Sequence, residues 1–133
     1  SNGGLWAGRT TVLFQMTKSG RFKKFTAKHG LADNNVTSIF EDSTGTLWVG
    51  SYGGLNRYEN GHFITETTMQ GLAYDVVNAI IEDQEGSIWI AAKDGLSRLN
   101  VRRFTTYTKQ NGLTHNNVIS VCEDADNSMW LAT

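Results

Sequence analysis

Three pairs of adjacent acidic residues are the first feature that could carry chemistry, since paired carboxylates can act as general acid and base or hold a cation. The pairs are Glu41-Asp42, Glu82-Asp83 and Glu123-Asp124. Neighbouring residues of a β-strand point to opposite faces, so the two carboxylates of one pair cannot converge on one substrate atom. We therefore predict that Asp42, Asp83 and Asp124 accept backbone N–H hydrogen bonds in the turn after each pair, with a cation site as the alternative.

Three tryptophans, Trp48, Trp89 and Trp130, could offer flat surfaces on which sugar rings stack. They recur at a constant spacing along the chain, and each follows an acidic pair by the same distance. A ligand site usually breaks the symmetry of a repeat, whereas a packing site keeps it. We therefore predict that these indoles lie in the core between repeated units, where each ring removes on the order of 150–250 Å² from water.

The remaining reactive side chains form no recognisable constellation. The histidines, His29, His62 and His115, fall in different parts of the chain's repeat, so we expect no metal site and no cofactor. Cys122 takes the repeat position of Phe40 and Ile81, which favours a small buried hydrophobe over a nucleophile. The sequence also has no Gly-rich phosphate loop and no serine nucleophile elbow, and we expect that it is not an enzyme.

The composition of the chain excludes further classes of function. The 133 residues include 12 basic and 13 acidic side chains, for a net charge of −1, which argues against a nucleic-acid surface. No apolar run approaches the roughly 18–20 residues that span a bilayer, so no membrane insertion is expected, and no signal peptide is visible. A single cysteine excludes an internal disulfide and leaves the compartment open.

The landmarks belong to one repeat with a period of 41 positions. Its start is marked by Gly30-Leu31, Gly71-Leu72 and Gly112-Leu113. Arg57 and Arg98 also recur, and we predict that they pair with acidic residues of the same or the next repeat. A partial copy opens the chain, where Gly3, Leu5-Trp6 and Gly8 precede Gly45, Leu47-Trp48 and Gly50 by 42 positions.

Each repeat is predicted to form four short strands. The expected strands of the first full copy are 36–41, 47–50, 55–58 and 63 to about 67, with Asn60-Gly61 as a hairpin turn. Four antiparallel strands in about 40 residues match a propeller blade. The predicted fold is therefore all-β, a β-propeller fragment of about three four-stranded blades in a single domain, 1–133. It divides into an incomplete blade over 1–29, complete blades over 30–70 and 71–111, and an incomplete blade over 112–133.

The compound motif resembles a known family. The pattern Gly-Leu, four or five residues, Val-x-x-Ile-x-Glu-Asp-x-x-Gly-x-Leu-Trp-Val-Gly-x-x-x-Gly-Leu-x-Arg-Tyr is similar to the two-component regulator propeller repeat. Residues 30–58 match it nearly throughout, residues 71–99 match with Ala91 for a glycine, and residues 112–133 match until the chain ends. The stretch Thr10-Thr11-Val12-Leu13-Phe14 departs from it. The resemblance implies a propeller sensor domain of bacterial signalling proteins, commonly periplasmic, which often detects carbohydrates.

Variable loops on a regular scaffold usually carry binding residues. Because strands alternate in direction, the loops from the fourth strand to the next first strand share a face with the loops from second to third strand. These loops differ between copies, and the candidate ligand-binding residues in them are Tyr52, Tyr74, Lys93, Asp94 and His115. The expected partner is a carbohydrate or another small ligand, the alternative is a scaffold that binds protein, and a propeller lyase or hydrolase is the third interpretation.

About three blades cannot close a standard ring of four to eight. An open ring exposes unpaired strand edges and apolar blade faces. The chain is therefore expected either to be a fragment of a longer protein or to associate with further copies, and we favour a homo-oligomer or closely packed copies over a stable isolated monomer.

Overall fold

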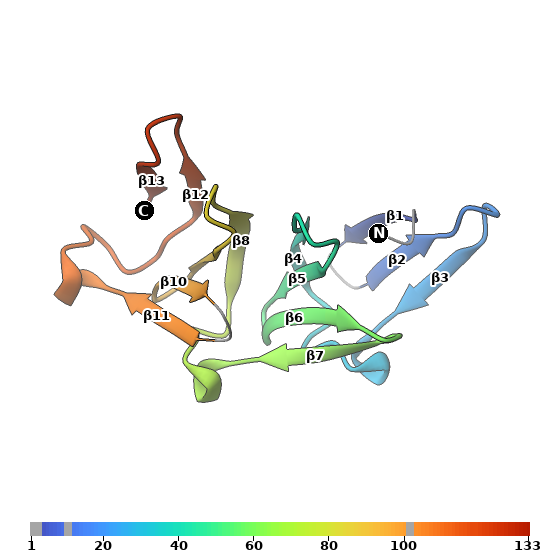
Figure 1. Ribbon diagram of the computed structural model, residues 1–133. Helices are drawn as coiled ribbons and strands as arrows, with labels where there is room; N and C mark the ends of the chain where they lie inside the picture. The colour runs from blue at the N-terminus through green and yellow to red at the C-terminus, as the bar shows by residue number, and fades with distance from the viewer. Residues whose placement is uncertain (1–3, 10–11, 101–102) are drawn as a thin grey trace.

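A computed structural model describes residues 4–9, 12–100 and 103–133. The predictions that rest on Gly3 and on Thr10-Thr11 lie outside these residues. Within them the chain forms four separate antiparallel sheets, which follow one another in sequence order across the molecule (Figure 1). The structure is therefore the predicted all-β propeller fragment, with two complete blades flanked by two incomplete ones.

The strands of each blade are consecutive in the chain. Blade 1 consists of β1 (Leu5–Arg9), β2 (Val12–Met16) and β3 (Phe22–Phe25). Blade 2 consists of β4 (Val36–Glu41), β5 (Leu47–Ser51), β6 (Gly54–Glu59) and β7 (His62–Glu66). Blade 3 consists of β8 (Val77–Glu82), β9 (Ile88–Ala92), β10 (Gly95–Asn100) and β11 (Arg103–Tyr107). Blade 4 consists of β12 (Ser120–Glu123) and β13 (Met129–Ala132).

The Asn-Gly hairpin turn is confirmed by its backbone. Asn60 and Gly61 have φ angles of 51° and 91°, and Glu59 pairs with His62 across the turn. Positive φ at both central residues is the requirement of a type I′ turn, which matches the twist of the flanking strands. The strands of blade 2 accordingly fall within one residue of their predicted bounds.

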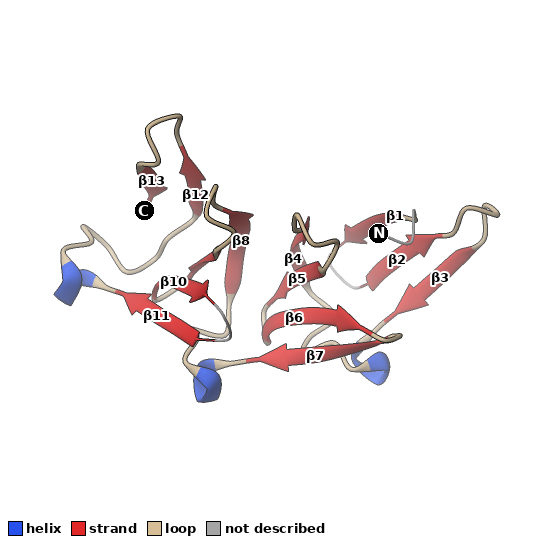
Figure 2. Cartoon of the chain, in the orientation of Figure 1, coloured by secondary structure: helices blue, strands red, loops and turns tan. Residues whose placement is uncertain are grey.

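Three short 3-10 helices join the blades and were not predicted. They are η1 (Ala27–His29), η2 (Thr68–Gln70) and η3 (Lys109–Asn111), shown in blue in Figure 2. A threonine caps each of these helices, and the side chain three residues later accepts a hydrogen bond from the backbone N–H of that threonine, as Gln70 does from Thr67. A glycine then ends the helix in the left-handed region, for example Gly71 at φ 108°. These turns carry the chain from the outer strand of one blade to the inner strand of the next.

Apolar side chains from neighbouring blades form three separate clusters among the described residues. Trp48 lies in the cluster between blades 2 and 3 with Ile88, and Trp89 lies in the cluster between blades 3 and 4 with Val121. Trp6 packs into the cluster between blades 1 and 2. Burial at the blade interfaces therefore holds the sheets side by side.

Two residues of blade 4 differ from their predicted burial. Trp130 is 64% exposed, whereas Trp48 at the equivalent position is 6% exposed. Cys122, expected to be a small buried hydrophobe, pairs with Trp130 across the two strands and is exposed as well. Both side chains occupy the face of blade 4 that points away from blade 3, and none of the described blades covers that face.

Candidate functional site

The aspartate of each acidic pair organises its own blade. In blade 3, Asp83 Oδ1 accepts the backbone N–H groups of Ser87 at 2.7 Å and of Glu85 at 3.0 Å. Its Oδ2 accepts the indole N–H of Trp89 at 2.7 Å. Asp42 and Asp124 make the corresponding bonds in blades 2 and 4. The carboxylate thus connects the first turn of the blade to the tryptophan of its second strand.

These hydrogen bonds control the ionisation of the aspartates. Burial by itself would raise the pKa of Asp83, but the Trp89 indole, the Ser87 N–H and the positive charge of Arg98 outweigh it and lower the pKa below 3.8. The pKa of Asp42 is lowered by the same balance of burial against hydrogen bonds. These groups are therefore held as carboxylates at neutral pH, which suits an acceptor in a turn and does not suit a general acid.

The glutamates of the pairs point the other way, toward the preceding blade. Glu82 accepts hydrogen bonds from the backbone N–H and the hydroxyl of Ser43, at 2.7 and 2.6 Å. Glu123 likewise accepts from the backbone N–H of Gln84 at 2.8 Å. The two carboxylates of one pair therefore serve different blades. No group of three or more His, Cys, Asp or Glu side chains suited to a metal ion occurs in the described part of the chain.

The recurring arginines pair with acidic residues, but not equally. Arg98 lies 2.7 Å from Glu85 and 3.5 Å from Asp83, and its guanidinium is 5.3 Å from the centre of the Trp89 ring. Arg57 has one partner among the described residues, Glu59, at 3.3 Å. The charge of Arg57 is thus less fully compensated than that of Arg98.

The five candidate ligand-binding residues lie on loops that share one side of the sheets. The loop after β5 contacts the loop before β4 through the Tyr52 N–H and the Asn35 carbonyl, at 3.2 Å. In blade 3, the Lys93 N–H meets the Val76 carbonyl at 3.0 Å. All five side chains reach the surface, and Tyr52 is 57% exposed.

Three of the five come together in blade 3. The Lys93 ammonium lies 5.9 Å from the centre of the Tyr74 ring, within the range of a cation–π contact. Asp94 accepts a hydrogen bond from the side-chain amide of Asn116 at 2.9 Å, which links this loop to blade 4. Tyr52 belongs to blade 2, and His115 lies on the loop that leads to blade 4. Asn116 was missed because its repeat equivalents, Asn34 and Asp75, signal only a structural role.

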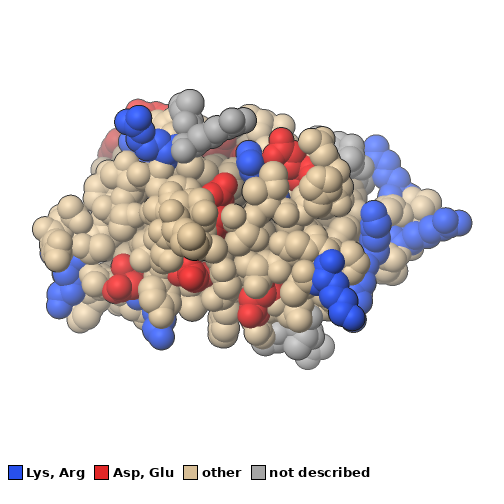
Figure 3. Space-filling model, turned by 90° about the horizontal axis from the view of Figure 1, so that it is seen from below, with Lys and Arg blue, Asp and Glu red and all other residues tan. Residues whose placement is uncertain are grey.

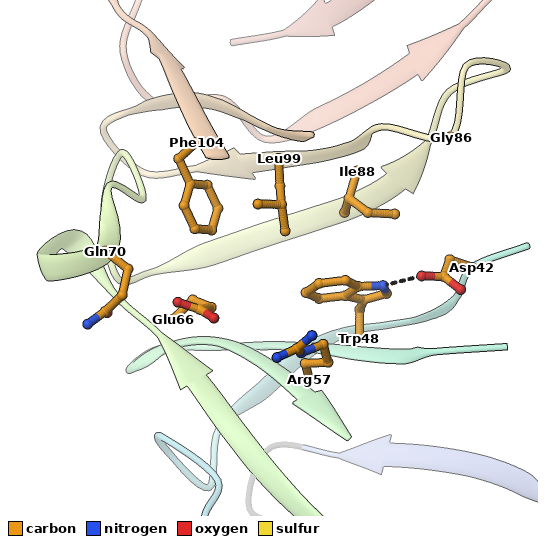
Figure 4. Close-up of a pocket in the computed structure, with 9 residues that line it drawn as sticks. All are labelled: Asp42, Trp48, Arg57, Glu66, Gln70, Gly86, Ile88, Leu99 and Phe104. Atoms are coloured by element: carbon orange, nitrogen blue, oxygen red, sulfur yellow. Dashed lines mark hydrogen bonds between the residues drawn. The ribbon is translucent and has the colours of Figure 1, made fainter. Parts of the chain in front are cut away.

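A separate cleft of about 540 Å³ opens between blades 2 and 3 (Figure 4). Its lining combines aromatic, aliphatic and charged groups, namely Asp42, Trp48, Arg57, Glu66, Gln70, Gly86, Ile88, Leu99 and Phe104. Glu66 and Gln70 were not among the predicted site residues. The signal for Glu66 was in the sequence, since it interrupts a repeat position that holds Phe25 in blade 1 and Tyr107 in blade 3.

Basic side chains gather at the end of the molecule formed by blade 1, at the right of Figure 3. The exposed members of this group are Lys18, Arg21, Lys23, Lys24 and Lys28, and the first acidic residue of the chain is Asp33. A net charge of −1 therefore conceals a polarised surface. No helix in the described ranges is long and apolar enough to cross a membrane.

A family model described as "two component regulator propeller" matches residues 30–53, 71–94 and 112–133, which together make up more than half of the chain. Comparison with curated proteins gave no match.

Several solved structures share the fold. The extracellular domain of the putative hybrid two-component system BT3049 from B. thetaiotaomicron matches 100% of this chain with a TM-score of 0.86 and 22% identity. Virginiamycin B lyase from Staphylococcus aureus matches 98% with a TM-score of 0.74 and 15% identity. The chain spans only 19% and 45% of the lengths of these two proteins. PorZ, a surface component of the type-IX secretion system of Porphyromonas gingivalis, matches 98% with a TM-score of 0.65 and 19% identity, and 23% of its own length is covered.

Proposed function

Because the chain belongs to the two-component regulator propeller family, we propose that it is a segment of an extracytoplasmic sensor domain that binds a small ligand on its loop face. The loop face is the surface formed by Tyr52, Tyr74, Lys93, Asp94 and His115. The similarity to extracellular domains of putative hybrid two-component systems supports the location and the role in signalling. The observation that carries the proposal is the placement of Lys93 against the ring of Tyr74 at the surface of blade 3.

The groups on the loop face suit a carbohydrate. Tyr74 is 39% exposed, so its ring and hydroxyl offer an apolar plane with a polar tip. Lys93 donates hydrogen bonds and Asp94 accepts them, as recognition of sugar hydroxyls requires. The acidic pairs, in contrast, are committed to turns and to neighbouring blades, and this favours binding over acid–base catalysis.

A double variant tests the proposal. Tyr74→Ala with Lys93→Ala removes the ring and the ammonium that contact each other, while the backbone bond of Lys93 to Val76 remains. We expect saccharide binding, measured by calorimetry with a panel of soluble oligosaccharides, to weaken about ten-fold or more. His62→Ala is the matched control, because His62 is exposed on the opposite face, at the turn between β6 and β7. Unchanged binding after replacement of all five residues would contradict the proposal.

A further inference from the structure

One outer-strand position breaks the symmetry of the blades. Blade 1 has Phe25 there, with its ring centre 5.4 Å from that of Trp6, and blade 3 has Tyr107, stacked 5.9 Å from Trp89. Blade 2 has Glu66 at the same position. Among the described residues no aromatic ring pairs with Trp48, although the equivalent tryptophans of blades 1 and 3 both have such a partner.

The facing wall of the cleft departs from the repeat as well. Between blades 1 and 2, the ring of Tyr58 fills the gap and lies 5.2 Å from Trp6 and 5.7 Å from Phe25. Blade 3 has Leu99 at the position of Tyr58. Two rings are thus replaced by an aliphatic side chain and a carboxylate, which leaves the cleft between blades 2 and 3 open (Figure 4).

The same departures leave two opposite charges incompletely paired. The half-buried Glu66 carboxylate receives no hydrogen bond and no ion pair from the residues that the structure describes. Thr44 replaces the glutamate that pairs with the arginine in blade 3, so Arg57 keeps only Glu59 as an acidic partner among the described residues. A partly buried charge without partners is costly, so a ligand that supplies them gains that free energy on binding.

We infer that this cleft is a second binding site, for a small zwitterion with an apolar group, of the size of an amino acid or a dipeptide. The ligand's ammonium pairs with Glu66, and its carboxylate pairs with Arg57. Its apolar side chain packs against Leu99 and Phe104, which line the facing wall. A volume of about 540 Å³ falls within the usual range of small-molecule sites.

The charge pattern distinguishes this class from others. A neutral polyol could form hydrogen bonds here, but it would leave Glu66 without a counter-charge and Arg57 with Glu59 alone. A simple cation or a simple anion would pair with only one of them. Only a ligand that carries both charges compensates both groups, and the apolar wall selects zwitterions with an aliphatic or aromatic side chain.

The test uses the full chain with L-leucine and L-leucyl-L-leucine as probes. Binding of each probe is measured by calorimetry and by the NMR signal of the Trp48 indole N–H. We expect at least one probe to bind and to shift this signal. N-acetyl and C-terminal amide derivatives of that probe each lack one charge and should bind about ten-fold or more weakly. Glucose should leave the Trp48 signal unchanged.

Two substitutions of Glu66 separate the effect of its charge from the effect of the open volume of the cleft. Glu66→Gln keeps the size and removes the charge, so it should weaken binding of the zwitterion about ten-fold or more. Glu66→Tyr restores the ring found in blade 3, so it should abolish binding while the thermal midpoint is kept or raised. Absence of binding by both probes would overturn the inference, as would equal binding of the derivatives or undiminished binding by the Glu66→Tyr variant. These substitutions leave the five residues of the loop face unchanged, so binding to the loop face and binding in the cleft are tested independently.

Discussion

Two tryptophans at one repeat position provide an internal comparison of burial. Trp48→Ala removes an indole that is 6% exposed at the interface of blades 2 and 3. Burial of about 150–250 Å² at about 25 cal/mol per Å² corresponds to about 4–6 kcal/mol as an upper bound, because the unfolded chain already buries part of this area, and we expect a cost of about 3–5 kcal/mol. Trp130→Ala removes the equivalent indole where it is 64% exposed, and at protein concentrations at which the chain is monomeric we expect a loss of less than about 1 kcal/mol.

The free energy of unfolding of both variants would be measured by urea denaturation, with circular dichroism and fluorescence as independent probes. Each indole donates to an aspartate, Trp48 to Asp42 at 2.8 Å and Trp130 to Asp124 at 2.7 Å, so the lost hydrogen bond is common to both variants. The difference between them therefore reports the packing between blades. Equal losses in the two variants would refute the reasoning, because burial would then not distinguish the two positions.

Three further predictions concern the links within and between blades. Asp83→Asn should destabilise the chain by about 1–3 kcal/mol at pH 6. Because the folded pKa of Asp83 lies below 3.8, the stabilisation from its carboxylate is complete above about pH 4–5 and is lost as the pH falls further. The difference in free energy of unfolding between wild type and variant, measured by urea denaturation, should therefore shrink toward pH 3. Glu82→Ala should cost about 1 kcal/mol by loss of the two bonds to Ser43, and an unchanged free energy of unfolding in the same assay would contradict this role of Glu82. The exposed face of blade 4, which carries Trp130 and Cys122, should drive self-association of the isolated chain; sedimentation at increasing concentration should show masses above that of one chain, and a single-chain mass throughout would contradict the homo-oligomer.

Repetition explains how much of the fold could be predicted. The strands of blade 2 were placed to within one residue because Asn60-Gly61 permits little but a type I′ turn. Asn127 takes the repeat position of Gly45 and Gly86, and its left-handed backbone, φ 63°, is the conformation that these glycines also adopt. The short helices were missed because the capping signal, a threonine followed three residues later by His29, Gln70 or Asn111, is local and easily mistaken for loop.

The candidate sites were less accessible to sequence reasoning. Loop variability selected residues on one face, but the contact of Lys93 with Tyr74 depends on how two loops, separated in the chain by β8 and β9, meet in space. The cleft was not predicted because it results from a missing aromatic ring, since Glu66 takes the position that an aromatic residue holds in blades 1 and 3. Comparing copies at positions 25, 66 and 107 would have revealed the exception.

The sequence by itself determined the blade, since strand length, turn type and the Asp–Trp pairing in each copy depend on residues a few positions apart. Which tryptophan is buried was decided only by tertiary structure, because burial requires a second sheet against the indole, and Trp48 has one where Trp130 does not. The cleft between blades 2 and 3 was decided in the same way. Its walls come from two different blades, and only the packing of their sheets brings Glu66 and Arg57 to face Leu99 and Phe104.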